Sequence, residues 1–206
     1  MKDLVVLVPD KNTEAAMKAL LEHRPHALGI RPITFDIFVH PRRDPGVYHE
    51  AEEFFRPLQS QYRYALVLFD FAFDGAPPAV RTAQDEVQEK LNRSGWKGKS
   101  AVVVINPELE AWVFGGSTYV VQELANGDRE LFQQVIAEYG AQPPDVPKPL
   151  KPKEAMEELL RRSRRPRSSA MYGDLAQRVS LESCRDAGFA RLRKMLQGWF
   201  QFEKGQ

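Results

Sequence analysis

The chain has 206 residues, enough for one compact domain with a sizeable hydrophobic core. Apolar residues make up 43% and charged residues 28%, a balance that argues against a disordered chain. The single cysteine, Cys184, excludes an intrachain disulfide framework and a zinc site built from several thiolates. No apolar run approaches the roughly 20 residues that cross a bilayer. We therefore expect a cytoplasmic protein without a membrane partner.

Charge is distributed unevenly along the chain. Residues 151–206 hold thirteen Lys and Arg against seven Asp and Glu, a net charge of +6, whereas the first 150 residues carry a net charge of −5. A basic segment joined to an acidic body predicts two different surfaces. The alternative is a solvated helical face whose basic residues pair with acidic residues of the same chain.

Strands and helices are predicted to alternate over the first part of the chain. Four short apolar or alternating runs indicate strands, over 4–8, 33–39, 64–69 and 100–105. Helical spacing predicts intervening helices: one capped by Asn12 or Thr13, one over 50–61 and one over about 78–93. Parallel neighbours need a crossover connection. The alternation therefore predicts an α/β fold with a mostly parallel sheet of about four strands and helices on both faces.

The pattern changes after residue 140. Residues 141–152 are rich in proline and predict a linker between an α/β domain (1–140) and a basic helical segment (153–206). In that segment we expect one helix over 153–162, one capped by Ser168 or Ser169, and one over about 186–202. We expect the segment to pack on the α/β domain.

Acidic side chains follow three of the four predicted strands. Asp10 follows the first, Asp70 and then Asp74 follow the third, and Glu108 and Glu110 follow the fourth. Ligands of an open parallel sheet gather beyond the carboxyl ends of its strands, and Mg²⁺ and Mn²⁺ prefer carboxylate oxygens. The pattern predicts a divalent metal site. The alternative is that these acids cap the helices, including one that starts near residue 107, through backbone N–H groups.

Two groups of basic residues are candidates for contact with phosphate. Arg42 and Arg43 follow His40 in a predicted loop over 40–48, and guanidinium groups bind phosphate bidentately. Pairing with acidic neighbours is the alternative. The second group places five arginines within seven positions, which suits either a nucleic-acid backbone or an acidic protein surface. Its members are Arg161, Arg162, Arg164, Arg165 and Arg167.

Four segments carry recognisable motifs: 10–14 (DKNTE), 70–75 (DFAFDG), 106–112 (NPELEAW) and 152–154 (PKE). In this order they resemble the Toprim fold, which is found in topoisomerases, primases and overcoming-lysogenization-defect nucleases. The likeness spans nearly the whole chain. It is greatest to the small, RloB-related Toprim-like proteins of bacterial phage-defence loci. Segments 36–46 and 164–169 resemble, more narrowly, one component of a methylation-associated defence system.

The resemblance implies a role in antiviral (anti-phage) defence together with other defence-system proteins. Toprim acids bind Mg²⁺ for phosphoryl transfer. By resemblance, Asp70, Asp10 and Glu110 would be the catalytic acids of a Mg²⁺- or Mn²⁺-dependent nuclease, and Asp74 would be a further metal ligand.

Three positions depart from the Toprim pattern. Asp10 stands where Toprim enzymes have glutamate, and Lys11 replaces a glycine that lets the backbone approach phosphate. Ala72 takes the place of the second acid of an Asp-x-Asp pair, and the nearest substitute, Asp74, lies two residues further on. Two functions therefore stay open. One is a metal-dependent nuclease, and the other is a catalytically degenerate module that binds partner proteins or nucleic acid within a defence complex.

Overall fold

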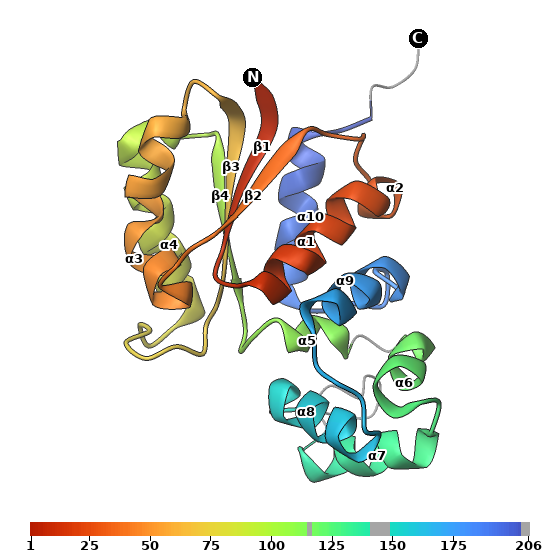
Figure 1. The fold of residues 1–206 in the computed structure, drawn as a ribbon. Helices are drawn as coiled ribbons and strands as arrows, with labels where there is room; N and C mark the ends of the chain where they lie inside the picture. The colour runs from red at the N-terminus through yellow and green to blue at the C-terminus, as the bar shows by residue number, and fades with distance from the viewer. Residues whose placement is uncertain (115–116, 141–148, 203–206) are drawn as a thin grey trace.

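The computed structural model describes residues 1–114, 117–140 and 149–202 (Figure 1). Within them, four strands form one sheet in the order β2-β1-β3-β4, and every pair is parallel. The α/β architecture with a four-stranded parallel sheet is thus confirmed, and each predicted strand is present with ends shifted by at most two residues. The strands are β1 (Lys2–Val8), β2 (Phe35–Val39), β3 (Tyr62–Asp70) and β4 (Ser100–Ile105).

Helices lie on both faces of the sheet and also beyond its carboxyl edge (Figure 1). A short 3₁₀ turn, η1 (Arg56–Leu58), and a π turn, η2 (Asn92–Trp96), extend two of them. The helices are α1 (Lys11–His23), α2 (Pro25–Leu28), α3 (Arg43–Phe55), α4 (Val80–Leu91), α5 (Glu110–Val113), α6 (Thr118–Ala125), α7 (Arg129–Glu138), α8 (Pro152–Arg162), α9 (Ser169–Arg178) and α10 (Ala187–Trp199).

The sheet separates two hydrophobic cores. Val5 and Leu7 of β1 lie in the core beneath α3 and α4, whereas Leu4 and Val6 lie in the core beneath α1 and α10. All four side chains are fully buried. A strand that is buried on both faces has a continuous apolar sequence rather than an alternating one. The apolar runs in the sequence therefore predicted β1, β3 and β4.

The starts of α1 and α3 differ from the sequence prediction. α1 is capped by Asp10, not by Asn12 or Thr13, since Asp10 Oδ1 accepts a hydrogen bond from the Thr13 N–H at 2.8 Å. α3 begins at Arg43 rather than near residue 50, so most of the predicted loop over 40–48 is helical. Proline in a first helical turn lacks only an N–H that would be unbonded there anyway, which is why the Pro-Gly pair after Asp44 is compatible with a helix start. Gly46 is required because a Cβ there would lie 2.1 Å from His40 Nδ1.

After β4 the chain forms several helices beyond the sheet and then packs α10 on the sheet. α5 begins at Glu110 rather than near residue 107. α6, α7 and α8 pack on one another beyond the carboxyl ends of the strands, α9 packs along α1, and α10 packs on β4 (Figure 1). Leu192 and Leu196 of α10 are fully buried in the same core as Leu4 of β1. Most of the predicted linker, residues 141–148, lies outside the described residues. Among the helices that are described, none combines the length and apolar character needed to cross a membrane.

Candidate site at the carboxyl ends of the strands

The strand order creates a topological switch point between β1 and β3. From β1 the chain crosses through α1 on one face to β2, and from β3 it crosses through α4 on the opposite face to β4. Open parallel sheets bind ligands outside the strand ends at such a point. Asp70 ends β3, and Asp10 follows the end of β1 by two residues. Asp10 and Asp70, two of the acids singled out in the sequence, therefore flank the position where this fold class places its ligands.

The carboxyl group of Asp70 is strongly affected by its surroundings at this edge. Its Oδ1 is buried and accepts no hydrogen bond from the described residues. Burial, followed by the charges of Asp44, Glu110 and Asp10, raises the pKa of Asp70 well above its usual range, against a backbone hydrogen bond from Leu109 that lowers it. Repulsion among these acids and loss of solvation both oppose the ionised form. A proton or a bound cation would relieve both.

Asp44 is a member of this group that the sequence analysis did not select. It lies in the first turn of α3, and its Oδ1 accepts a hydrogen bond of 2.8 Å from the backbone N–H of Asp70. Burial raises the pKa of Asp44; the hydrogen bond from Asp70 lowers it and the charge of Asp10 raises it further. The available signal was an acid followed by proline, a combination that suits the first turn of a helix.

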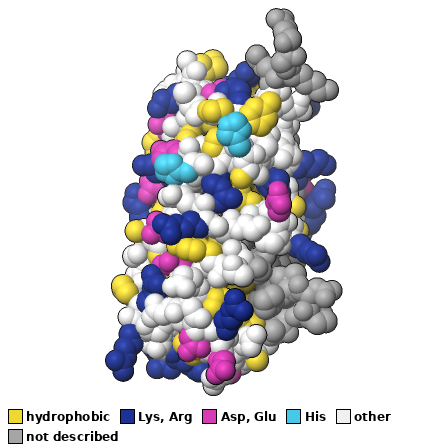
Figure 2. Space-filling model, turned by 90° about the vertical axis from the view of Figure 1, so that its right-hand side faces the viewer, with side chains coloured by type: hydrophobic (Ala, Val, Ile, Leu, Met, Phe, Trp, Pro, Cys, Tyr) yellow, Lys and Arg dark blue, Asp and Glu magenta, His cyan; other side chains and the backbone are white. Residues whose placement is uncertain are grey.

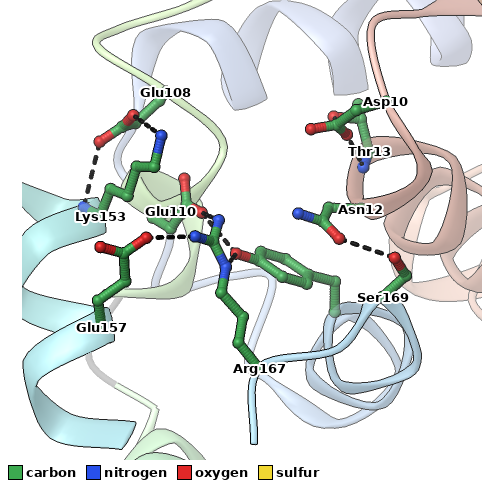
Figure 3. A network of polar contacts seen from close by, with 10 residues as sticks. Asp10, Asn12, Thr13, Glu108, Glu110, Lys153, Glu157, Arg167 and Ser169 are labelled. Carbon is green, nitrogen blue, oxygen red and sulfur yellow. Dashed lines mark hydrogen bonds and ion pairs between the residues drawn. The ribbon is translucent and has the colours of Figure 1, made fainter. Parts of the chain in front are cut away.

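Glu110 is held by a cation from the same chain (Figure 3). Its side chain is 4% exposed, and its Oε1 accepts hydrogen bonds from Arg167 Nη2 at 2.6 Å and from the Tyr172 hydroxyl. Arg167 also donates from Nε to the Tyr172 oxygen at 2.9 Å and pairs with Glu157 of α8. Burial, and then the charge of Glu110, raises the pKa of Tyr172. Neither Tyr172 nor Glu157 was selected from the sequence, because their link to Glu110 spans long separations along the chain.

Glu108 caps α8. Its Oε1 accepts a hydrogen bond from the backbone N–H of Lys153 at 3.2 Å, and its Oε2 lies 3.9 Å from Lys153 Nζ (Figure 3). Burial, and then the charge of Glu110, raises the pKa of Glu108 to about 7 although Lys153 lowers it. The capping alternative, in which an acid caps the helix that follows it, is confirmed for Asp10. Glu108 instead bonds to the start of a helix that begins more than 40 residues later. The motifs at 106–112 and 152–154 are in direct contact.

The acids around Asp70 interact electrostatically but do not form a ready set of metal ligands. Within residues 1–114, 117–140 and 149–202, no three His, Cys, Asp or Glu side chains are arranged to hold a metal ion. Asp10 uses its Oδ1 as the cap of α1, and Glu110 bonds to Arg167 and Tyr172. Asp74 is exposed in the loop after β3. The structure thus brings Asp10, Asp70 and Glu110 into one electrostatic group, with two of the three already engaged.

His40 and Arg42 lie directly before α3, and Arg42 is the N-cap residue of that helix. His40 is buried, and its Nδ1 accepts a hydrogen bond from the Arg42 backbone N–H at 3.2 Å, while its Nε2 lies 3.3 Å from Glu50 Oε2. Burial, and then the charge of Arg42, lowers the pKa of His40. The Arg42 side chain pairs with Glu50, as the pairing alternative predicts, whereas Arg43 is exposed.

Four of the five clustered arginines pair with acidic side chains of the same chain, and Arg164 is exposed. This geometry favours the intramolecular pairing considered for the basic segment, and contact with nucleic acid stays a prediction. On the face drawn in Figure 2, Lys and Arg side chains are spread among acidic and apolar ones rather than gathered into one uniform patch. The ion pairs are Arg161–Glu158, Arg162–Glu158, Arg162–Glu138, Arg165–Glu123, Arg167–Glu110 and Arg167–Glu157.

Comparison of the chain with models of protein families, with curated proteins and with solved structures gives no match. The Toprim resemblance therefore depends on the four motifs alone. Parallel sheets of this kind serve many unrelated functions, so the functional argument depends on the residues at the strand ends.

Proposed function

We propose that this protein is a divalent-cation-dependent phosphodiesterase that acts on nucleic acid within an antiviral defence system. The observation that carries the proposal is the buried, unbonded Oδ1 of Asp70, which lies at the switch point of the sheet among other carboxyl groups. A buried polar atom without a partner is costly in a folded protein, and such perturbed acids are found most often at functional sites.

The residues present fit a hard divalent cation in their chemistry. Asp70, Asp10 and Glu110 supply only oxygen donors, the kind that Mg²⁺ and Mn²⁺ prefer, and Asp44 adds a fourth carboxylate to the group. When bound, such an ion polarises a phosphoryl oxygen and lowers the pKa of its water. Asp44 positions the end of β3 through the Asp70 N–H. Thr13 fixes the orientation of the Asp10 carboxylate through hydrogen bonds of 2.8 and 2.9 Å.

The defence role, and Toprim identity itself, are proposed from the motifs. The contact between segments 106–112 and 152–154 supports treating the motifs as one functional unit, since Glu108 of the first accepts the backbone hydrogen bond of Lys153 in the second. Other proteins of the same defence system are the partners that this proposal implies.

Incubation of the purified protein with single- and double-stranded DNA and RNA, in the presence of Mn²⁺ or Mg²⁺, tests the activity. We expect cleavage by the wild type and a loss of at least about 100-fold in the Asp70→Asn variant, because the buried carboxylate is the central ligand. Asp74→Asn is the matched control: it removes the same charge from the same loop region but from an exposed position, and we expect it to retain activity. Equal products from the wild type and Asp70→Asn would contradict the proposal.

A binding module is the second candidate, and one observation favours it. The described residues contain no ready set of three metal-ligating side chains, and the position of the second Toprim acid is held by exposed Ala72. If this candidate is correct, neither metal supports cleavage, and wild-type and Asp70→Asn proteins assemble equally well with their defence partners. The same set of variants therefore separates the two functions.

A further inference from the structure

Arg167 differs from the other four arginines of its cluster. Arg161 and Arg162 bond to Glu158 on the surface of α8, whereas the Arg167 guanidinium reaches the buried carboxylate of Glu110 at the strand-end site (Figure 3). It lies between two acids: Glu110 is 4% exposed and Glu157 is 48% exposed. Arg167 itself is 30% exposed. The guanidinium therefore joins the buried Glu110 of the candidate metal site to Glu157, which is exposed to solvent.

The backbone on both sides of Arg167 is held in place. Ser163 donates a hydrogen bond from its Oγ to the Leu124 carbonyl at 2.8 Å, and Ser168 caps α9 by accepting the Met171 N–H. The guanidinium can therefore change position by rotation of the Arg167 side chain. Glu157 bonds to Nη1 of Arg167 and Glu110 bonds to Nη2, so the contact with Glu157 can persist when Nη2 leaves Glu110.

The contact of Arg167 with Glu110 stabilises the metal-free protein. A buried carboxylate needs a counter-charge and hydrogen-bond donors, because an unpaired charge in the interior is strongly unfavourable. Arg167 supplies the charge, and the Tyr172 hydroxyl supplies a second donor to the same oxygen. A divalent cation bound to Asp70 and Glu110 would supply the charge in its place, and two positive charges at one carboxylate would repel each other. Tyr172 would keep one bond to Glu110 after the exchange.

We propose that Arg167 is a displaceable internal cation: it neutralises Glu110 in the metal-free protein and leaves this carboxylate when a divalent ion binds. The inference depends on the proposed function, since it needs the ion at the acids. It adds that Arg167 and the divalent ion compete for Glu110, and that this competition sets the affinity for the metal. Removal of the Arg167 charge strengthens metal binding, whereas removal of an arginine ion pair elsewhere in the cluster does not.

Calorimetric titration of Mn²⁺ into four proteins tests the inference: the wild type, Arg167→Gln, Arg167→Lys and the control Arg161→Gln. Arg161 is the matched control because its side chain is 70% exposed and pairs with Glu158 of α8 rather than with Glu110. We expect Arg167→Gln to bind Mn²⁺ about tenfold or more tightly than the wild type, since one competing charge is gone. Arg167→Lys retains the charge and stays closer to the wild type, and Arg161→Gln is unchanged. Thermal unfolding of each variant without metal confirms that it is folded.

The outcomes separate the two levels of the proposal. If the wild type binds Mn²⁺ and Arg167→Gln binds with equal or lower affinity, the displaceable cation is wrong while the metal site stands. If Arg167→Gln binds tightly and the wild type only weakly, the inference is supported directly. If none of the four proteins binds Mn²⁺, the metal site itself is wrong, and the inference falls with it.

Discussion

Asp70 holds a carboxyl group whose ionised form is opposed by burial and by three further acids. Its Oδ1 has no bonding partner among the described residues, although hydrogen bonds satisfy most buried polar atoms of folded proteins. Without a bound cation, Asp70 therefore lowers the free energy of unfolding at every pH at which its carboxyl group is ionised in the folded protein. A group retained at such a cost is a candidate for function.

The destabilisation of the folded protein by Asp70 has a measurable pH dependence. The pKa of Asp70 is raised above the unfolded value of about 3.9, so the folded protein binds more protons than the unfolded chain, and stability falls as the pH rises from about 4 through the folded-state pKa. We expect Asp70→Asn to raise the free energy of unfolding of the metal-free protein by about 1 kcal/mol or more at pH 7.5, with a gain that shrinks toward pH 4. Urea unfolding in the presence of a chelator, at both pH values, measures it.

The exposed Asp74 provides the comparison for this experiment, because Asp74→Asn removes a charge that solvent already screens. A pH-independent loss of stability in Asp70→Asn would contradict the assignment of Asp70 as the electrostatically destabilised acid.

Among the elements, α10 connects the C-terminal part of the chain to the sheet. Leu192 is fully buried where α10 packs on β4, and Asp186, the N-cap of the helix, also accepts a hydrogen bond of 2.9 Å from Trp112 Nε1 of α5. Gly188 permits the close approach, since a Cβ there would lie 2.9 Å from the Val104 carbonyl oxygen. The last helix therefore belongs to the core of the α/β fold.

Leu192→Ala tests this role of α10. We expect it to lower the free energy of unfolding by about 2–5 kcal/mol, the usual cost of a leucine-to-alanine cavity in a core. Lys194→Ala, an exposed position two residues away, should change it by less than about 0.5 kcal/mol. Denaturant titration of both variants makes the comparison. Similar small effects for the two would mean that α10 is not integral to the core.

The same elements explain what the sequence could and could not predict. β1, β3 and β4 were located because parallel strands buried on both faces leave continuous apolar runs. Of the two predicted caps, Ser168 and Ser169, the structure shows Ser168 as the N-cap of α9. The order β2-β1-β3-β4 was not predictable, since no local signal states which strands are neighbours. The start of α3, and with it Asp44, was missed because Pro-Gly also marks turns.

Over the whole molecule, the strand-end site is built from segments that lie far apart in the chain. Asp70 ends β3, Asp10 lies between β1 and α1, and Glu110 comes from α5. Arg167, which lies between α8 and α9, reaches Glu110 across 57 positions. Ser169 of α9 donates a hydrogen bond of 2.8 Å to Asn12 of α1 beside Asp10 (Figure 3). The acids could be chosen from their places after strands, but their counter-charge could not, because only the tertiary fold brings it there.

The acids at the switch point are proposed to exchange their internal arginine for a divalent cation. A crystal structure of the wild type grown with Mn²⁺, with anomalous scattering to locate the metal, tests it most directly. The predicted result is an anomalous peak bonded to carboxylate oxygens of Asp70, Asp10 and Glu110, with the Arg167 guanidinium moved from Glu110 toward Glu157. An Arg167–Glu110 contact that is unchanged, with no peak among these carboxylates at millimolar Mn²⁺, would contradict it.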